Sequence, residues 1–166
     1  MEKDLKKLII LTAPSGAGKT SITKYLLDKY PALSFSISAA TRAPRGKEVD
    51  GVDYHFMSVD AFKQKIEEDA FIEWEMVYEG SYYGTLKSEL DRIWGLGKIP
   101  MLDIDVQGAI QIRACEDELV RRCLLDLFIL PPSLSELRQR LAGRAAVAGQ
   151  VGRQHRVAVM GEPAAV

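Results

Sequence analysis

The sequence has 166 residues, which is enough for one ordinary domain with room for an inserted lobe. Hydrophobic residues make up 47% and charged residues 27%, and this globular composition excludes a disordered chain. The formal net charge of −1, with both signs mixed along the chain, excludes a general attraction to nucleic acid or to a membrane surface. Any site for an anion therefore has to be local.

The cysteine count and the N-terminal segment both favour a cytoplasmic protein. The two cysteines, Cys115 and Cys123, are too few for a secreted disulfide framework. The apolar run before Pro14 is too short for a signal peptide or a membrane span. We therefore expect a reducing compartment, with neither nucleic acid nor a membrane as a partner. The sequence leaves the oligomeric state open.

The first part of the chain predicts strands, a helix and a loop. Residues 7–12 are apolar and rich in β-branched side chains, which predicts a buried strand. Residues 20–30 carry apolar side chains at helical spacing and predict a helix. Residues 33–39 alternate in character and predict a second strand, whereas residues 41–53 contain the glycines and prolines of a loop. Residues 54–57 predict a further short strand.

The rest of the chain predicts a small mixed segment and then alternating elements. Ser58 is placed to cap a helix over residues 59–70, and the aromatic, alternating residues 71–85 predict a hairpin. The later elements are a helix near 86–94, strand 99–104, helix 106–114, strand 124–130, and a helix that Ser133 and Glu136 open as a capping box. Strands that alternate with helices at both ends predict a parallel α/β core with an inserted lobe.

The segment 13–21, APSGAGKTS, joins the first predicted strand to the first predicted helix and has the composition of a phosphate-binding loop. Gly16 and Gly18 provide backbone freedom where main-chain N–H groups turn toward a phosphate. Lys19 is a mobile cation for the β- and γ-phosphates of a nucleotide, and Thr20 brings a hydroxyl beside Mg²⁺. Alanine stands where this motif usually opens with glycine, at a position where a small residue suffices. The candidate phosphate-binding residues are Ala13, Pro14, Ser15, Gly16, Ala17, Gly18, Lys19, Thr20 and Ser21.

Two carboxylates, Asp103 and Asp105, lie at the end of the predicted strand over 99–104. A carboxylate at the C-terminal end of a parallel strand lies near bound phosphates, where Asp103 would order Mg²⁺ together with Thr20, in part through water. The alternatives are a plain glycine-rich turn for the loop and, for the two aspartates, carboxylates that nearby backbone N–H groups satisfy.

Five motifs in one order give the chain a resemblance to the guanylate kinase family over about residues 5–144. They are APSGAGKT, SISAATRAPRGKEVDGVDYHF, FIEWEMVYEGSYYGT, MLDIDVQG and FILPPSLSELRQRLAGR. The resemblance implies a P-loop NTPase-type parallel sheet flanked by helices, with an inserted small α+β GMP-binding lobe and a partial lid. It implies a core over 1–37 and 86–136, a GMP-binding lobe over 38–85 and the start of a lid over 137–144. The implied reaction is ATP + GMP → ADP + GDP, with Mg²⁺ as the cofactor of ATP.

Arginines and tyrosines of the expected lobe are candidates for the acceptor phosphate. Arg42 and Arg45 lie three residues apart in a loop, where two guanidinium groups can hold one phosphate. Tyr54 and Tyr83 add phenolic donors, and the resemblance implies that all four residues grip the phosphate of GMP. The alternative for the arginines is a solvated basic loop.

Glu73 is the candidate for recognition of the base. Guanine presents the N1–H and N2–H₂ donors on one edge, and a carboxylate can accept from both. Ser38 and Thr85 are candidates to donate to O6, and the resemblance adds Asp105 to the GMP-binding set. Adenine would leave Glu73 facing an acceptor, as an unpaired buried charge. The alternative for Glu73 is an exposed strand position.

Arg140 and Arg144 match the first lid arginines of the family, and with Lys19 and Arg42 they complete the expected catalytic set. Leu137 and Leu141 are expected to anchor their helix, so that the arginines face elsewhere. The alternative is a solvated helix end.

The composition changes over residues 145–166, which hold a single acidic residue, Glu162, and no aromatic residue. We find no family motif there, and we expect a tail that is disordered or read out of frame. Reading the coding DNA near codon 144 in the other frames tests this hypothesis.

Three other functions compete with the kinase. The departure after residue 144 is compatible with a catalytically impaired module that binds a nucleotide or a protein. A GTPase is disfavoured because the chain contains no asparagine for an Asn-Lys-x-Asp motif. A related kinase of sugar phosphates or deoxynucleotides is disfavoured by Glu73 with Ser38 and Thr85.

Overall fold

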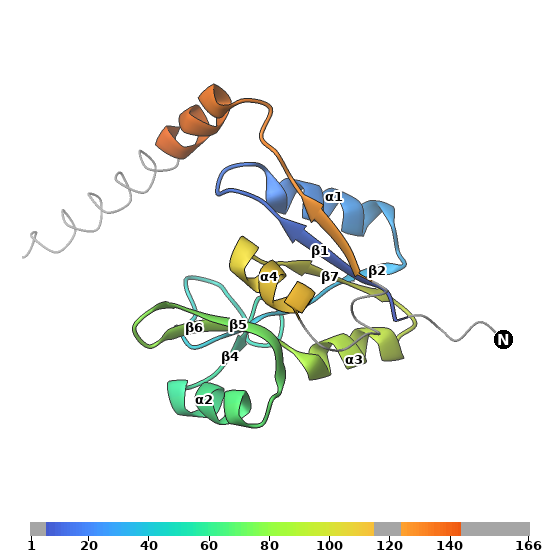
Figure 1. The fold of residues 1–166 in the computed structure, drawn as a ribbon, viewed down its shortest axis with the longest axis vertical. Helices are drawn as coiled ribbons and strands as arrows, with labels where there is room; N and C mark the ends of the chain where they lie inside the picture. The colour runs from blue at the N-terminus through green and yellow to red at the C-terminus, as the bar shows by residue number, and fades with distance from the viewer. Residues whose placement is uncertain (1–5, 115–123, 144–166) are drawn as a thin grey trace, which may run out of the picture.

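The core of the protein is a four-stranded parallel sheet, and the computed structural model describes residues 6–114 and 124–143. The strands are β1 (Leu8–Thr12), β2 (Leu33–Phe35), β7 (Ile99–Asp103) and β8 (Leu124–Phe128), in the order β2-β7-β1-β8 (Figure 1). β1 lies in the middle and pairs with β7 on one side and β8 on the other. The loop that follows β1 therefore leaves the sheet at its centre, which is where parallel α/β folds place their ligands.

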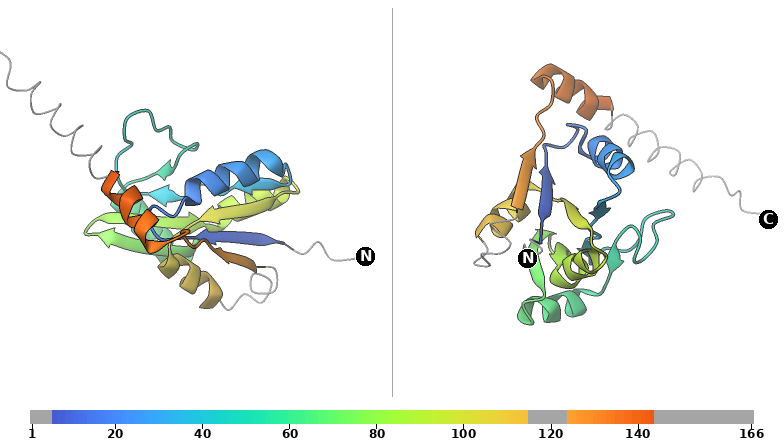
Figure 2. Two further views of the ribbon diagram at one scale, coloured as in Figure 1. Left: turned by 90° about the horizontal axis from the view of Figure 1, so that it is seen from above. Right: turned by 90° about the vertical axis from the view of Figure 1, so that its right-hand side faces the viewer.

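Helices cover both faces of this sheet. Helix α1 (Lys19–Lys29) lies on one face and helix α4 (Val106–Ala114) on the other (Figure 2). Helix α3 (Lys87–Gly95) shares a buried cluster with α4 and the sheet, and this cluster consists of Leu8, Ile10, Leu90, Leu102, Ile104, Ala109 and Ile112. None of the helices among residues 6–114 and 124–143 is long and apolar enough to span a membrane.

The segment between β2 and α3 forms a second, smaller unit with its own sheet. Its strands are β3 (Ala39–Ala40), β4 (His55–Phe56), β5 (Phe71–Tyr78) and β6 (Ser81–Leu86), in the order β4-β3-β6-β5. Helix α2 (Val59–Glu67) packs on it through Phe62, whose ring stacks on that of Phe71 at a centroid distance of 4.3 Å. The predicted cap is confirmed, because Ser58 Oγ accepts from the N–H of Ala61 at 3.1 Å.

The single strand expected over residues 33–39 is wrong, since the chain forms two strands there in different sheets. The N–H of Ser36 donates to the carbonyl of Met101 in the core sheet at 3.0 Å. Two residues later, the carbonyl of Ser38 accepts from the N–H of His55 in the lobe at 2.9 Å. Alternation of side chains indicates a strand but not its sheet, so the sequence did not reveal this crossing.

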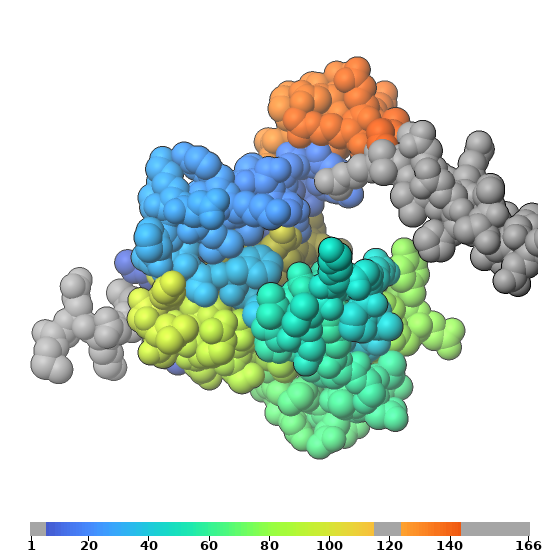
Figure 3. All heavy atoms as spheres, turned by 180° about the vertical axis from the view of Figure 1, so that it is seen from behind, coloured from blue at the N-terminus to red at the C-terminus, as the bar shows by residue number. Residues whose placement is uncertain are grey.

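The last described helix, residues 134–143, lies at one end of the molecule, against the loop after β1 (Figure 3). Ser133 Oγ accepts from the N–H of Glu136 at 3.1 Å, as one half of the expected capping box requires. The other half is not formed, because the carboxylate of Glu136 pairs with Arg140 instead. The helix thus begins where the sequence predicts, but Glu136 has a different partner.

Candidate active site

The loop after β1 has the backbone of a phosphate-binding loop. Gly16 has φ +87° and Gly18 has φ +101°. Residues with a Cβ rarely adopt such values, so both positions favour glycine. The carbonyl of Gly18 accepts from the N–H of Ser21 at 3.0 Å and so begins α1. Ala13 does not have a positive φ. Among the described residues, Asp69 is the one non-glycine residue with a positive φ. The first position of the loop therefore does not need glycine, and alanine fits it.

Lys19 and Asp103 form an ion pair at the head of the loop. The register Leu11↔Asp103 between β1 and β7 brings the carboxylate beside the first turn of α1. Lys19 Nζ also donates to the carbonyl of Ile104 at 3.0 Å, and both members of the pair remain about one-fifth exposed. The ammonium group is thus held at the strand ends, where a phosphate can compete with Asp103 for it.

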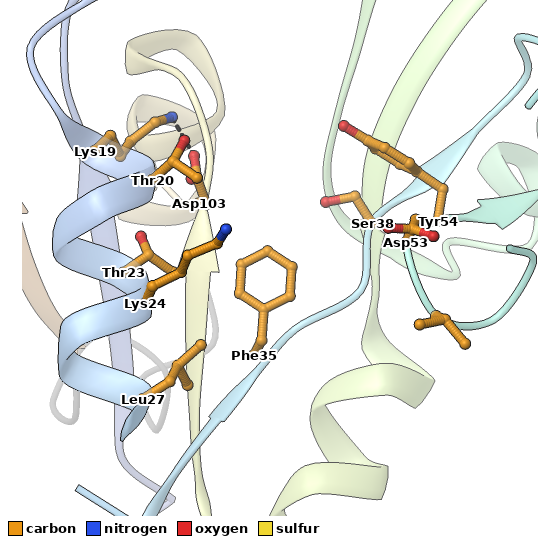
Figure 4. Close-up of a pocket in the computed structure, with 11 residues that line it drawn as sticks. Lys19, Thr20, Thr23, Lys24, Leu27, Phe35, Ser38, Asp53, Tyr54 and Asp103 are labelled. Carbon is orange, nitrogen blue, oxygen red and sulfur yellow. Dashed lines mark ion pairs between the residues drawn. The ribbon is translucent and has the colours of Figure 1, made fainter. Parts of the chain in front are cut away.

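A cleft of about 660 Å³ separates α1 from the small lobe (Figure 4). This volume suits a ligand of nucleotide size. In Figure 4, Lys19, Thr20 and Asp103 lie at one side, and Ser38, Asp53 and Tyr54 lie across the cleft. The full lining is Lys19, Thr20, Thr23, Lys24, Leu27, Phe35, Ser38, Val52, Asp53, Tyr54 and Asp103. Five predicted site residues therefore share one cavity, whereas the other predicted GMP-binding residues do not line it, namely Arg42, Arg45, Glu73, Tyr83, Thr85 and Asp105.

Arg42 is at the centre of a cation–aromatic cluster on the lobe. Its guanidinium carbon lies 4.7 Å from the centroid of Tyr54, and Tyr54 meets Tyr83 edge-on at 6.2 Å. Its two terminal nitrogens donate to the carboxylate of Glu48 at 2.6 and 2.8 Å. The hydrogen bond from Arg42 lowers the pKa of Glu48 to about 2, and the same contact, with smaller ones to Tyr83 and Tyr54, raises the pKa of Arg42.

Arg45 joins this cluster through its main chain rather than its side chain. Its N–H donates to Glu48 at 2.7 Å, while the residue as a whole is exposed. Sequence reasoning missed Glu48, although it lies six residues after Arg42 in the quoted loop motif. An acidic residue close behind two arginines was the available signal.

Glu73 is buried between the lobe and α4. The residue is 6% exposed, and its carboxylate accepts from Thr85 Oγ1 at 2.6 Å. Burial raises the pKa of Glu73 above its ordinary value of 4.5, although the hydrogen bond from Thr85 opposes this shift. The alternative of an exposed strand position is therefore wrong, and Glu73 and Thr85 are brought together as the sequence suggested. Ser38 lies on the cleft wall with Tyr54.

A second carboxyl group, which the sequence analysis missed, lies beside Asp105. A hydrogen bond with Asp105 raises the pKa of Glu75 to about 7. Burial of Asp105 opposes its ionisation, but hydrogen bonds from Glu75 and from the N–H of Gly108 outweigh it and lower the pKa of Asp105. The signal was the two-residue spacing of Glu73 and Glu75, which places both on one face of β5.

Arg140 faces the phosphate-binding loop. Its Nη1 lies 3.4 Å from the carbonyl oxygens of Gly16 and of Ala17. Side-chain carbons of Leu137 and Leu141 lie 3.3 Å from the position that a Cβ on Gly16 would occupy. The expectation that these leucines turn the arginine elsewhere is wrong, because positions 137, 140 and 141 share one helix face. Arg144 and the tail over 145–166 lie outside the described residues.

The fold and the site together define a P-loop nucleotide-binding protein whose inserted lobe closes one side of the ligand cleft. The family model described as guanylate kinase matches residues 5–162, a range that continues past the last motif seen in the sequence. The chain therefore belongs to the guanylate kinase family.

Individual relatives agree with this assignment. The guanylate kinase of Salinibacter ruber is 45% identical over 141 residues, which are 84% of this chain and 71% of that protein. The guanylate kinase of Clostridium perfringens (strain 13) is 48% identical over 137 residues, which are 82% of this chain and 61% of that protein. A crystal structure of guanylate kinase from Anaplasma phagocytophilum has a TM-score of 0.66 at 31% identity, and the match covers 89% of this chain and 72% of that one. The chain thus spans about two thirds of the length of these curated relatives.

Proposed function

We propose that this chain transfers the γ-phosphoryl group of ATP to GMP, giving ADP and GDP. One observation carries the proposal: the end of the phosphate-binding segment and the tyrosine-bearing lobe line opposite sides of the same cleft of about 660 Å³. Lys19 and Thr20 line it from α1, and Ser38 and Tyr54 line it from the lobe. Such an arrangement suits two anionic ligands that meet end to end, because phosphoryl transfer depends mainly on positioning and charge stabilisation.

Arg42 has one side-chain donor that can serve the acceptor phosphate. Its terminal nitrogens are engaged by Glu48, but its Nε is buried and has no hydrogen-bond partner among residues 6–114 and 124–143. A buried donor without a partner is costly, and a phosphate oxygen would satisfy it. Tyr54 lies under the same guanidinium and Tyr83 makes a side-chain hydrogen bond with it, and we assign all three residues, with Arg45, to the GMP phosphate.

Glu73 supports guanine as the base. Its buried carboxylate accepts from Thr85 Oγ1 and from the main chain of Thr85, and a carboxylate can accept further hydrogen bonds, such as those from N1–H and N2–H₂ of guanine. Those donors would favour the ionised form, which burial alone disfavours. Adenine offers an acceptor at the corresponding ring nitrogen and would leave the charge unpaired. Asp105 lies near enough to Glu73 to act on its charge and completes the acidic edge of this pocket.

The donor set at the loop fits Mg²⁺ bound with ATP. Thr20 and Asp103 offer one hydroxyl and one carboxylate in the same cavity. Among the described residues, no group of three or more His, Cys, Asp or Glu side chains could hold a metal. Mg²⁺ usually takes one or two protein ligands and completes its shell with phosphate and water, so the sparse set is suitable. When bound, the ion would neutralise charge on the transferred phosphoryl group.

Lys19 and Arg140 supply the remaining positive charge. Lys19 would exchange Asp103 for the phosphates of ATP, since its ammonium group is already held at the loop. Arg140 is anchored by Glu136 and lies over the carbonyls of Gly16 and Ala17, next to the expected phosphates. Both cations would stabilise charge that develops as the phosphoryl group moves.

The test is ATP consumption by the purified full chain with GMP, with AMP and with no acceptor. We expect turnover that depends on GMP and exceeds turnover with AMP by about a hundredfold or more, as expected for a site built to pair with donors of its substrate. Equal turnover with AMP would refute the guanine pocket. Binding of GMP without any turnover would support a nucleotide-binding module instead.

A further inference from the structure

One face of α4 lies against the outer edge of the lobe. Asp105, Gly108 and Gln111 follow each other at three-residue intervals and therefore share that face. The strand opposite is β5, the last strand in the order β4-β3-β6-β5. An edge strand has main-chain N–H and C=O groups that no neighbouring strand satisfies. Helix α4 belongs to the nucleotide-binding core, so this contact joins the core to the lobe.

Gln111 takes the place of a neighbouring strand at one residue of β5. Its side-chain oxygen accepts from the N–H of Trp74 at 3.1 Å, and its side-chain nitrogen donates to the carbonyl of Trp74 at 2.9 Å. The N–H of Trp74 belongs to the peptide group that joins Glu73 to Trp74. The carboxamide therefore holds the backbone directly next to the residue assigned to the base.

Because Gly108 has no side chain, the carboxylate of Glu73 can occupy the space beside it. A Cβ on Gly108 would lie 2.8 Å from Oε2 of Glu73 and 3.3 Å from its Cδ. Gly108 is inside a helix, where glycine is less favourable than alanine, and it is not among the residues with positive φ. The close approach of Glu73 is thus the structural reason for glycine at this position.

We propose that Gly108 and Gln111 are positioning residues that set the carboxylate of Glu73 for recognition of guanine. This inference rests on the proposed function. Gln111 fixes the main chain of β5, and Gly108 fixes how closely the carboxylate approaches α4. The nucleotide-binding core therefore sets the position of Glu73 in the lobe through helix α4, which follows the strand β7 that carries Asp103.

The first experiment removes the carboxamide with little change in length, by Gln111→Met. The matched control is Gln64→Met on α2, where Gln64 also donates from its side chain, to Glu68 at 2.8 Å. We expect the kcat/KM for GMP to fall about tenfold in Gln111→Met, the effect of one to two net hydrogen bonds, with the KM for ATP unchanged. The control should match the wild type. Equal losses for GMP and ATP, or no loss for GMP, would overturn the role of Gln111.

The second experiment is a double-mutant cycle of Gly108→Ala with Glu73→Ala, read by calorimetric binding of GMP. We expect Gly108→Ala to weaken GMP binding about tenfold when Glu73 is present and about twofold or less when alanine replaces it, because alanine removes the side-chain atoms that the new Cβ would contact. Equal effects in both backgrounds would overturn the inference. Thermal unfolding of each variant separates a local effect from a loss of folding, and this cycle decides the question if Gln111→Met does not fold.

The wild type separates the two proposals. If it consumes ATP with GMP while these variants bind GMP normally, the positioning role fails and the kinase assignment stands. If the wild type neither binds nor phosphorylates GMP, both proposals fail.

Discussion

Replacing Glu73 by glutamine should weaken GMP binding and stabilise the free protein at the same time. Glu73 is 6% exposed, and Thr85 Oγ1 donates to its carboxylate at 2.6 Å. A glutamine oxygen can keep this hydrogen bond, but the glutamine NH₂ group would face the N–H donors of guanine. The two effects have opposite signs because the carboxylate proposed to recognise guanine is also a buried charge in the free protein, where it lowers stability.

The loss in binding follows from the hydrogen bonds that guanine makes. A hydrogen bond to a charged group contributes about 1.5–3 kcal/mol, so loss of one such bond corresponds to about 2 kcal/mol, or about thirtyfold in the Kd for GMP. The Kd for ATP should not change, since ATP is assigned to the loop after β1. Calorimetry with each nucleotide measures both constants.

The gain in stability depends on pH. Because burial raises the pKa of Glu73 in the folded protein, the folded state binds a proton more tightly than the unfolded state does. The free energy of unfolding of the wild type should therefore fall as the pH rises from below 4.5 through the folded-state pKa. Glu73→Gln removes this decline and should unfold at a higher temperature than the wild type at pH 8. Equal weakening of GMP and ATP, or a lower unfolding temperature at pH 8, would refute the reasoning.

Three further substitutions test the loop and the acidic edge. Lys19→Ala should lower kcat on the order of a hundredfold or more while the Kd for GMP stays the same, and an unchanged kcat would contradict the role of the loop. Gly16→Ala should weaken ATP binding about tenfold, because φ is +87° and Leu137 lies 3.3 Å from the new Cβ. The matched control is Gly80→Ala, where φ is +73° and no atom lies within 4 Å of the new Cβ, and it should leave ATP binding intact. Glu75→Gln should make the free energy of unfolding depend less on pH between pH 4.5 and 7, because the raised pKa of Glu75 makes the wild type lose stability as the pH rises through that range. Urea titrations at several pH values measure this dependence, and equal slopes for the wild type and the variant would contradict the prediction.

Local sequence patterns predicted most of the elements because those elements follow from neighbouring residues. The strand, loop and helix around Lys19 are set by apolar runs and glycines, and Ser58 caps its helix through a residue three positions away. Residues 33–39 show where this reasoning ends. Their alternation is compatible with any sheet, and the assignment to two sheets depends on distant partners such as Met101 and His55.

Contacts between distant segments explain what the sequence analysis missed at the site. Gln111 has no local signal, because its partner Trp74 is 37 residues away. Glu75 and Asp105 are brought together only when α4 packs on β5. For Arg140 the helix was predicted correctly, but the face that meets Gly16 is decided by packing of the whole segment. The side-chain types were readable from the sequence, and their pairings were not.

The lobe joins the core where two paired strands begin and end. Ala39 of β3 lies beside Gly84 of β6, so the chain enters and leaves the lobe at neighbouring positions. Because both junctions lie on one pair of strands, we expect that the lobe can be exchanged as a unit between homologous proteins. The carboxamide of Gln111 is outside the lobe, yet it makes two hydrogen bonds to the backbone of the lobe. A chimera that aims to change base selectivity should therefore take α4 from the same parent as the lobe.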